Sequence, residues 1–303
     1  ENFELSNKNY KNLKDNVDIV INSAAIVKHY GDEKKFIETN VGSTQNIINF
    51  CMEKNKRLLH ISSLSVSGNS SLDGDSQGIT INEKMSFNEK DLYKGQNLNN
   101  SYLKSKFKAE RLILEKMDEG LDAQILRLGN ITNRLSDGVF QINPEENAFA
   151  CKIRSMIGLG AIPEYLKKEY MEFTPVDMCA DAIIKIMQNY EENFSIFHIY
   201  DNEHVYFEKL RDYLENVDVN LEIVSHEKFR GKVEELLKGK NENILSGIIN
   251  DFDKDKKLTY NSNIDILSEF TRAFLYKIGF VWPKIDEKYI EKYVKYMKKI
   301  KFL

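Results

Sequence analysis

The chain has 303 residues, of which 42% are hydrophobic and 11% aromatic, so it can form one large domain or two ordinary ones. Its net charge of −4 and pI of about 5.9 exclude a global basic surface that would recruit nucleic acid. The longest apolar runs cover only a few residues, which excludes a membrane-spanning helix, and no signal peptide is visible. We therefore expect a cytoplasmic protein with no nucleic acid or membrane partner.

The cysteines and the first residue add two expectations. Cys51, Cys151 and Cys179 are odd in number and far apart, so they match neither a disulfide framework nor a zinc site. This pattern favours reduced thiols in the core. Residue 1 is Glu rather than Met, which suggests a piece of a longer polypeptide or a processed one.

The N-terminal part alternates strands and helices. Val17–Ile21 is a short β-branched run typical of a buried parallel strand, and the small residues Asn22–Ala25 follow it. A helical spacing of apolar residues then covers Ile37–Cys51. Arg57–Ile61 predicts a second strand, which small polar residues close at Ser62–Ser65.

A polar, glycine-containing stretch follows over residues 68–100, and we interpret it as a long, partly ordered loop. Ser101–Met117 predicts a helix, with Asn100 as its N-cap and Gly120 as its stop signal. Ala123–Leu128 predicts a third strand. Strand, helix, strand, helix and strand is the order of a parallel sheet with right-handed crossovers.

The later chain changes character. Helices are predicted near Ala148–Ile157 and after Pro175, and Phe194–Tyr200 reads as one more strand. From Val205 onward the pattern is mainly helical and strongly charged. We predict an α/β fold, a Rossmann-like doubly wound parallel sheet, with a mostly helical C-terminal subdomain. Residues 1–135 and 172–204 form the first part, and residues 136–171 and 205–303 form the second.

The carboxyl ends of the three predicted strands share one feature. They are followed by Asn22–Ala25, Ser62–Ser63 and Gly129–Ile131, all small or polar. Ligands gather at this edge of a parallel sheet. The sequence therefore predicts a site there.

Tyr102 and Lys106 lie four residues apart at the start of the predicted helix, so both project from one face. The later residues of that face, Ala109, Ile113 and Met117, are apolar, so the face points inward. A lysine on such a face is costly unless something polar binds there. A phenol beside an ammonium group is a tuned proton donor, because the positive charge favours the phenolate.

Ser63 would complete this donor set. Directly after a strand, it can hydrogen-bond a carbonyl oxygen to which Tyr102 gives a proton as hydride reaches the carbon. Lys106 can lower the pKa of Tyr102 and hydrogen-bond a ribose. The pairs Tyr10/Lys14 and Tyr30/Lys34 have the same spacing, but neither has a serine after an upstream strand, so we interpret both as surface coincidences.

Four motifs together resemble the sequence pattern of the extended short-chain dehydrogenase/reductases. They are Asn-x-Ala-Ala after the first strand, Asn40-Val41 in a helix, Ser-Ser after the second strand, and Tyr-x-x-x-Lys. The chain is similar, more narrowly, to the terminal thioester reductase domains of nonribosomal peptide synthetases. The stretches that match are Val27–Gly31, His60–Gly68, Arg127–Arg134, Glu172–Asp177 and Gly279–Pro283.

The resemblance implies NADPH-dependent release of a peptide held as a thioester on the phosphopantetheine arm of a peptidyl carrier protein, beside other synthetase domains on the same polypeptide. Hydride attack gives a thiohemiacetal that expels the thiol and leaves an aldehyde, which some members reduce to the alcohol. Residues 1–135 and 172–204 become the NADP-binding domain, and the helical subdomain binds substrate and carrier.

The resemblance also assigns roles to residues. It makes Ser63, Tyr102 and Lys106 the catalytic residues and gives Asn40 a supporting role. The cofactor-binding residues that it implies are Ala24, Ala25, Asn40, Ser62, Lys106, Gly129, Asn130 and Ile131.

One family feature is missing. Such enzymes begin with a strand and a Gly-x-x-Gly-x-x-Gly turn that holds the cofactor's pyrophosphate, and this sequence has no such motif. Gly158-Leu-Gly160 follows a helix and is interpreted as a turn. The first strands of the fold are therefore expected to be absent, with Val17–Ile21 as an exposed sheet edge and weak NADPH binding by this chain alone.

Several alternatives stay open. A carboxylic acid or fatty acyl reductase, or a sugar-nucleotide epimerase, uses the same scaffold, and a truncated domain could serve only to dock a carrier. A metal site at His29 or His60 is disfavoured, because no acidic or cysteine cluster accompanies them. The C-terminal run over Asp286–Lys301 predicts an amphipathic helix, and Lys292, Lys295 and Lys299 on it are candidates for docking an acidic carrier.

Overall fold

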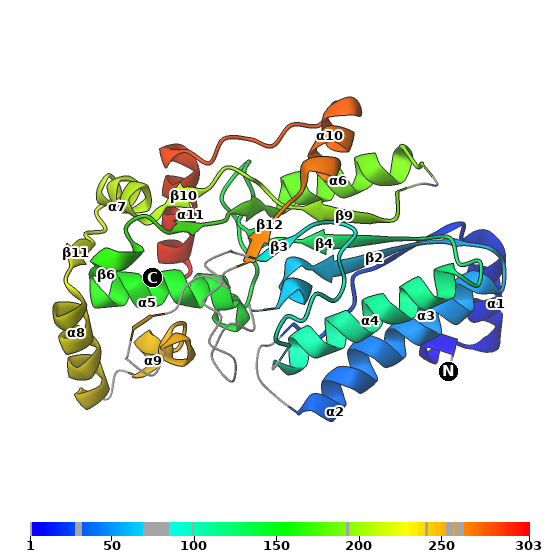
Figure 1. Ribbon diagram of the computed structural model, residues 1–303, viewed down its shortest axis with the longest axis horizontal. Coiled ribbons are helices and arrows are strands. Elements are labelled where there is room, and N and C mark those ends of the chain that lie inside the picture. Colours follow the sequence, from blue (N-terminus) through cyan, green and yellow to red (C-terminus); the bar gives the residue numbers. More distant parts are fainter. Residues whose placement is uncertain are drawn as a thin grey trace. The chain divides into compact units, whose positions relative to one another are not determined.

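The computed structural model describes residues 2–27, 32–68, 85–98, 100–191, 194–239, 242–252, 257–258 and 264–303. The chain divides into two compact units. Unit 1 comprises Glu1–Leu128, Ala182–Ile199 and Ser262–Phe280, and unit 2 comprises Gly129–Asp181, Tyr200–Asn261 and Val281–Leu303. Figure 1 labels helices and strands of both units where there is room.

Unit 1 is built on a four-stranded sheet in which every pairing is parallel. The strands are β1 (Ile19–Asn22), β2 (Arg57–Ser63), β4 (Ala123–Leu128) and β9 (Ile196–Ile199), in that spatial order. The predicted Rossmann-like parallel sheet is therefore confirmed. Among the described residues β1 is an edge strand, and Ile19 and Ile21 on it are 38% and 42% exposed.

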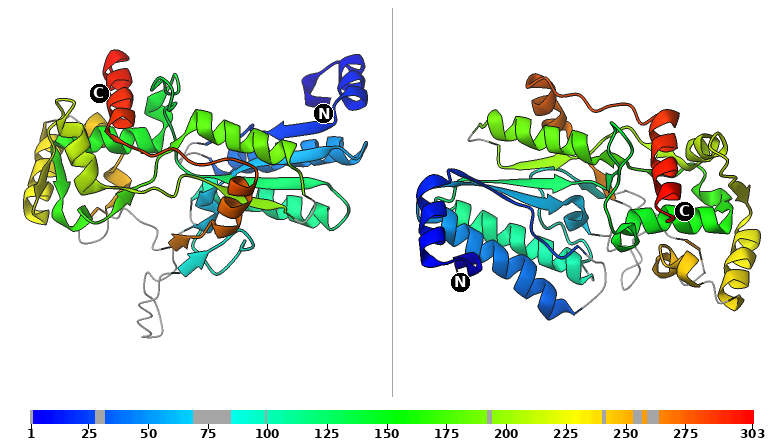
Figure 2. Two further views of the ribbon diagram at one scale, coloured as in Figure 1. Left: turned by 90° about the horizontal axis from the view of Figure 1, so that it is seen from above. Right: turned by 180° about the vertical axis from the view of Figure 1, so that it is seen from behind.

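Helices cover both faces of this sheet. α3 (Gly42–Met52) and α4 (Ser101–Met117) lie against one face, and α10 (Glu269–Lys277) and the second half of α6 (Val176–Gln188) lie on the other (Figures 1 and 2). The apolar stripes of α3 and α4 meet the branched residues of the strands, because both strand faces of a parallel sheet are buried. Side chains that are fully buried there include Ile48, Leu58, Ile113 and Ile125.

The helix predicted over Ile37–Cys51 is not a single regular helix. It begins with α2 (Glu33–Phe36), continues as a π-helical turn, η2 (Ile37–Val41), and only then becomes α3. Single π turns inside helices are frequent at functional sites. Asn40, buried within η2, bonds both Ile26 and Ser105, and these contacts account for the local widening.

Unit 1 also contains short elements around the sheet. The predicted loop over residues 68–100 includes β3 (Met85–Phe87), which pairs in parallel with β12 (Ile264–Ile266) far along the chain. Residues 69–84 and 99 lie outside the described part, and so do His29 and Tyr30. The remaining elements of this unit are η1 (Asn2–Glu4), α1 (Asn7–Asn16) and η3 (Leu64–Ser67).

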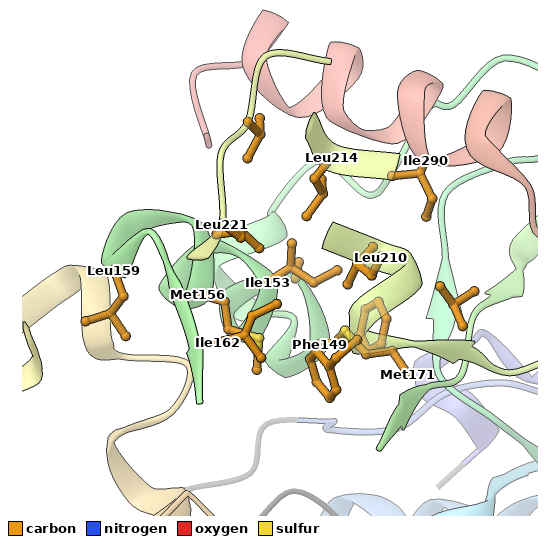
Figure 3. Close-up of a cluster of buried hydrophobic side chains, with 14 of the residues drawn as sticks. Phe149, Ile153, Met156, Leu159, Ile162, Met171, Leu210, Leu214, Leu221 and Ile290 are labelled. Atoms are coloured by element: carbon orange, nitrogen blue, oxygen red, sulfur yellow. The ribbon is translucent and has the colours of Figure 1, made fainter. Parts of the chain in front are cut away.

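Unit 2 is mainly helical and has its own hydrophobic core. Figure 3 shows part of this core, where α5, α7 and α11 and several short strands contribute apolar side chains. Its helices are η4 (Pro144–Glu146), α5 (Ala148–Leu159), η5 (Glu164–Leu166), α7 (Phe207–Glu215), α8 (His226–Lys238), α9 (Glu242–Leu245), η6 (Ile249–Asp251) and α11 (Glu287–Lys299). Its strands are β5 (Ile131–Thr132), β6 (Ala161–Pro163), β7 (Tyr170–Met171), β8 (Thr174–Pro175), β10 (Val205–Tyr206) and β11 (Glu222–Val224).

Among the described residues, no helix is both long enough and apolar enough to cross a bilayer.

Candidate active site

Helix α4 presents the predicted acid and lysine on its buried face. Its N-cap is Asn100, whose side chain accepts a hydrogen bond from the Tyr102 amide at 2.7 Å. Tyr102 and Lys106 are only 7% and 5% exposed, and the next residue of the stripe, Ala109, is 1% exposed. The polar ends of two long side chains are therefore held inside unit 1, as the helical spacing predicts.

Ser63 is the last residue of β2 and lies against the phenol. Its hydroxyl accepts from the Ser65 amide at 3.1 Å, which fixes the turn into η3, and it interacts with the Tyr102 side chain. Burial raises the pKa of Tyr102, and the hydrogen bond with Ser63 lowers it. The structure thus brings together the two groups that sequence reasoning placed on one carbonyl oxygen.

Lys106 is the third member of the set and lies one helical turn after Tyr102 on α4. Its ammonium donates to the Ile61 carbonyl at 3.0 Å, which ties α4 to β2. Burial lowers the pKa of Lys106 to about 8, while the nearby Glu110 carboxylate raises it. The predicted effect of the ammonium on the pKa of Tyr102 stays a prediction.

Asn40 links three segments next to these residues. Its side chain accepts from the Ile26 amide at 2.7 Å and donates to the Ile26 carbonyl at 3.0 Å. It also donates to the Ser105 hydroxyl at 2.9 Å, which in turn donates to the Tyr102 carbonyl at 2.7 Å. The π turn aims the Asn40 amide at the loop after β1 and at α4 together. Its direct contact with a cofactor stays a prediction.

The other predicted cofactor residues of unit 1 lie at the carboxyl edge of the sheet. Ala24 is exposed and Ala25 is half-buried in the segment after β1. The Ser62 hydroxyl is buried and donates to Glu110 at 2.5 Å, so this oxygen is already used inside the protein. A role for Ser62 in the cofactor site would therefore rest on its backbone.

Unit 2 contains the third predicted strand end, Gly129–Ile131. The backbone amide of Asn130 donates to the Glu172 carboxylate at 2.6 Å, and the backbone carbonyl of Asn130 accepts from the Thr174 backbone amide at 3.0 Å. A Cβ on Gly129 would lie 2.6 Å from Glu172 Oε1 and 2.6 Å from the Tyr200 Cβ, so only glycine fits. The turn is therefore built around a carboxylate.

Glu172 itself escaped sequence reasoning as a site residue. Burial raises its pKa to about 7, the hydrogen bonds from the Asn130 amide and the Thr174 hydroxyl lower it, and the neighbouring Asp201 carboxylate raises it. Asp201 is 1% exposed, and burial raises its pKa to about 7 as well. A lone Glu before a short strand carries no sequence signal for such a pair.

The competing sequence candidates have local explanations. Lys14 forms an ion pair with Glu53, and the Tyr10 ring packs against Phe50. His60 is buried with its Nδ1 3.2 Å from the Asn22 amide nitrogen, and burial lowers its pKa to about 3. Among the described residues, no cluster of three or more His, Cys, Asp or Glu could hold a metal ion.

The donor set fits one half of a nicotinamide dinucleotide. An ammonium, a phenol and a hydroxyl meet at the carboxyl edge of parallel strands, where such cofactors bind. Lys106 would hold a ribose hydroxyl, and Tyr102 and Ser63 would face the reacting carbonyl. The sequence contains no Gly-x-x-Gly-x-x-Gly turn to hold the pyrophosphate.

Comparisons with known proteins agree with this fold and site. The profile of a family described as male sterility protein, an NAD-binding family, matches residues 1–183. The large subunit of L-2-aminoadipate reductase from Candida glabrata is 26% identical over 240 residues, which are 78% of this chain and 17% of that protein. The chain thus spans a small part of this relative.

Solved structures point the same way. A thiolation-reductase di-domain from an archaeal non-ribosomal peptide synthetase superposes with a TM-score of 0.84 and 33% identity, over 97% of this chain and 60% of that one. The terminal R domain of the myxalamid PKS-NRPS pathway shares the fold, with a TM-score of 0.81 and 19% identity, over 100% of this chain and 73% of that one. The chain belongs to the NAD-binding male sterility protein family and is an extended short-chain dehydrogenase/reductase that resembles the terminal reductase domains of nonribosomal peptide synthetases.

Proposed function

We propose that this chain is the reductase domain that releases a carrier-bound peptidyl thioester as an aldehyde, with NADPH as the reductant. The contact of Ser63 with Tyr102, one helical turn from Lys106, carries the proposal. The similarity to a thiolation-reductase di-domain supports a substrate on a thiolation domain.

In the proposed reaction, the bound cofactor supplies a hydride to the thioester carbon. The Ser63 hydroxyl donates a hydrogen bond to the carbonyl oxygen, and the Tyr102 phenol gives that oxygen a proton. The resulting thiohemiacetal loses its hydroxyl proton as the carbon–sulfur bond breaks, so the products are an aldehyde and the free pantetheine thiol. Burial of Tyr102 keeps the phenol protonated until the carbonyl oxygen becomes basic.

The test is turnover of a peptidyl pantetheine thioester by the 303-residue chain. Affinity for NADPH is measured first, because the missing Gly-rich turn predicts weak binding, and the assay is then run at saturation. Tyr102→Phe should lower kcat by about 10²- to 10⁴-fold, the usual contribution of a positioned general acid. Aldehyde is trapped and identified, and its absence in the wild type would contradict the proposal.

Tyr10→Phe is the matched control, since Tyr10 and Lys14 have the same spacing on α1. It should leave kcat unchanged. Equal losses in both variants would remove Tyr102 from the reaction. If NADPH binds but no thioester is reduced, the chain acts as a carrier-docking module, whereas a preference for free carboxylic or fatty acyl substrates would identify the alternative reductases.

We also infer a docking role for the outer face of α11. Its inner face is buried as predicted, with Tyr289, Ile290 and Tyr293 each 1% exposed. Lys292, however, donates to the Leu135 and Ser136 carbonyls at 2.8 and 3.0 Å, so a change there would disturb the fold of unit 2.

The docking test therefore uses Lys295 and Lys299, which are exposed on α11. Changing both to Glu should raise KM for a carrier-bound thioester, because an acidic carrier would be repelled. The KM for a free pantetheine thioester should not change. Equal effects on the two substrates would refute docking at this face.

A further inference from the structure

A buried ion pair lies one turn beyond Lys106 on α4, and the proposed chemistry does not use it. Arg127 and Glu110 are both 0% exposed, and the guanidinium donates to the carboxylate from Nε at 3.1 Å and from Nη2 at 2.8 Å. Isolating such charges from water is costly, so a pair of this kind needs good geometry and further hydrogen bonds. Both Arg127 and Glu110 have such further hydrogen bonds.

The pair sits on a defined position in the sheet. Ser62 of β2 and Arg127 of β4 are register partners, so their side chains project from the same face of neighbouring strands. The Ser62 hydroxyl donates to the same carboxylate at 2.5 Å. Glu110, Ser62 and Arg127 thus form a hydrogen-bonded triangle that links α4 to β2 and β4.

The triangle is anchored on its far side. Arg127 Nη1 donates to His198 Nε2 at 3.1 Å, and His198 Nδ1 donates to the Leu267 carbonyl at 2.7 Å. Burial lowers the pKa of His198 to about 3, so the ring is neutral and can accept from the guanidinium. The Glu110 carboxylate is therefore bonded directly to side chains of β2 and β4 and, through Arg127, to a side chain of β9.

Two adjacent serines then meet two residues of one helix. Ser63 contacts Tyr102, and Ser62 binds Glu110, two turns further along α4. Lys106 lies between these two points and bonds the Ile61 carbonyl of the same strand. A helix held at two separate points can neither slide nor rotate along the strand.

We propose that Glu110 is a positioning residue whose carboxylate, held by Arg127 and Ser62, fixes Tyr102 and Lys106 relative to Ser63. This inference rests on the proposed function for its kinetic readout. Glu110 also stabilises the Lys106 ammonium electrostatically, whereas His60 of β2, whose pKa burial and the Lys106 ammonium lower to about 3, is neutral.

The test compares Glu110→Gln with Thr271→Val at saturating NADPH. Thr271 is buried in the same unit, and its hydroxyl donates to Glu89 at 2.8 Å and accepts from the His198 backbone amide at 2.9 Å. Thr271→Val therefore weakens unit 1 but leaves the Glu110 carboxylate and the side chains that bind it in place. Glu110→Gln should lower kcat about 10²-fold, the effect of a small misplacement of reacting groups, with KM within about 3-fold. Thr271→Val should leave kcat within about 2-fold although it lowers stability, since it removes the hydrogen bonds of the hydroxyl but touches no reacting group.

A second readout is the pH profile. Glu110→Gln should move the alkaline limb of kcat to lower pH, because Lys106 loses a neighbouring negative charge. Equal kcat values for the two variants, or a change confined to KM, would overturn the inference. Glu110→Asp serves if the amide variant does not fold, and it should lose kcat too, because the shorter side chain cannot span the triangle.

Amide hydrogen exchange separates this inference from the proposed function. If the wild type reduces no thioester, the proposed function fails, but Glu110→Gln should still speed exchange across residues 104–110 relative to Thr271→Val. Equal exchange in the two variants would overturn the positioning role.

Discussion

Each unit contains a carboxylate held by several hydrogen bonds, and the two are stabilised in opposite ways. In unit 1 Glu110 meets the guanidinium of Arg127. In unit 2 Glu172 is held by the neutral Asn130 amide and Thr174 hydroxyl, and burial raises its pKa to about 7. The first carboxylate is neutralised by a cation, and the second by a proton.

The difference has a functional consequence. Glu110 is held by the side chains of Arg127 and Ser62, so its place beside Lys106 depends on these two partners. A carboxyl that titrates near neutrality changes its hydrogen bonding with pH, and Glu172 supports the turn at Gly129 and Asn130. We therefore expect the loss of Arg127 to destabilise unit 1, and the ionisation of Glu172 to destabilise the Gly129 turn of unit 2.

The largest expected effect comes from breaking the cation-paired site. Arg127→Met leaves Glu110 buried without its counter-charge, which should lower the free energy of unfolding by about 3–5 kcal/mol. The double variant Arg127→Met with Glu110→Leu should recover much of this loss, because no buried charge remains. Urea denaturation at pH 7 measures both. A single variant as stable as the wild type would show that the pair contributes nothing to stability.

The contribution of Glu172 to the pH dependence of stability should be smaller than the effect of Arg127→Met. The pKa of Glu172 rises from 4.5 to about 7 on folding, so the folded state holds a proton that the unfolded state has lost. The free energy of unfolding should therefore fall as pH rises from about 4.5 to about 7, by at most about 3 kcal/mol at ~1.4 kcal/mol per unit. Glu172→Gln should remove this part of the slope.

The measurement is the difference in unfolding free energy between Glu172→Gln and the wild type across pH 4–8, a range chosen around the two pKa values. Asp201 interacts with Glu172, so the same difference is also measured between Asp201→Asn and the double variant, where this interaction is absent. A difference that is flat with pH would mean that the pKa of Glu172 does not change on folding.

Sequence reasoning recovered the parts of the site that follow from local pattern. Helix α4 has the bounds predicted from its cap, its apolar stripe and the glycine after it, and Tyr102 and Lys106 face inward as expected. Parallel strands rich in branched residues were recognisable for the same reason. Local signals sufficed because each of these features depends on residues close in the chain.

The polar network was not foreseen, because it joins residues that are distant in the chain. Arg127 in a strand and Glu110 in a helix each look like residues with one end in solvent. The packing of α4 on the sheet brings Glu110 to Arg127, and the register of β2 and β4 places Ser62 beside Arg127. The spacing of Glu110 four residues after Lys106, on an inward face, was the one available signal.

The π turn was also unforeseen. The apolar spacing over Ile37–Cys51 fits a regular helix, and nothing local requires a wider turn at Asn40. The reason is tertiary, since the Asn40 amide must reach both Ile26 and Ser105.

The smallest expected effect tests the comparison within unit 2 alone. The Thr174 hydroxyl donates to Glu172 and accepts from the Asp201 amide at 3.2 Å, so Thr174→Val removes both contacts at little change in volume. Below the pKa of Glu172 the lost bond is between neutral groups and should cost about 1 kcal/mol, whereas above it the bond is to a carboxylate and should cost about 2 kcal/mol. Thermal denaturation at pH 5 and pH 8, on either side of the raised pKa, measures the two costs. If the substitution costs the same at both pH values, Glu172 does not change its charge between them, and neutralisation by a proton cannot distinguish the carboxylate of unit 2 from that of unit 1.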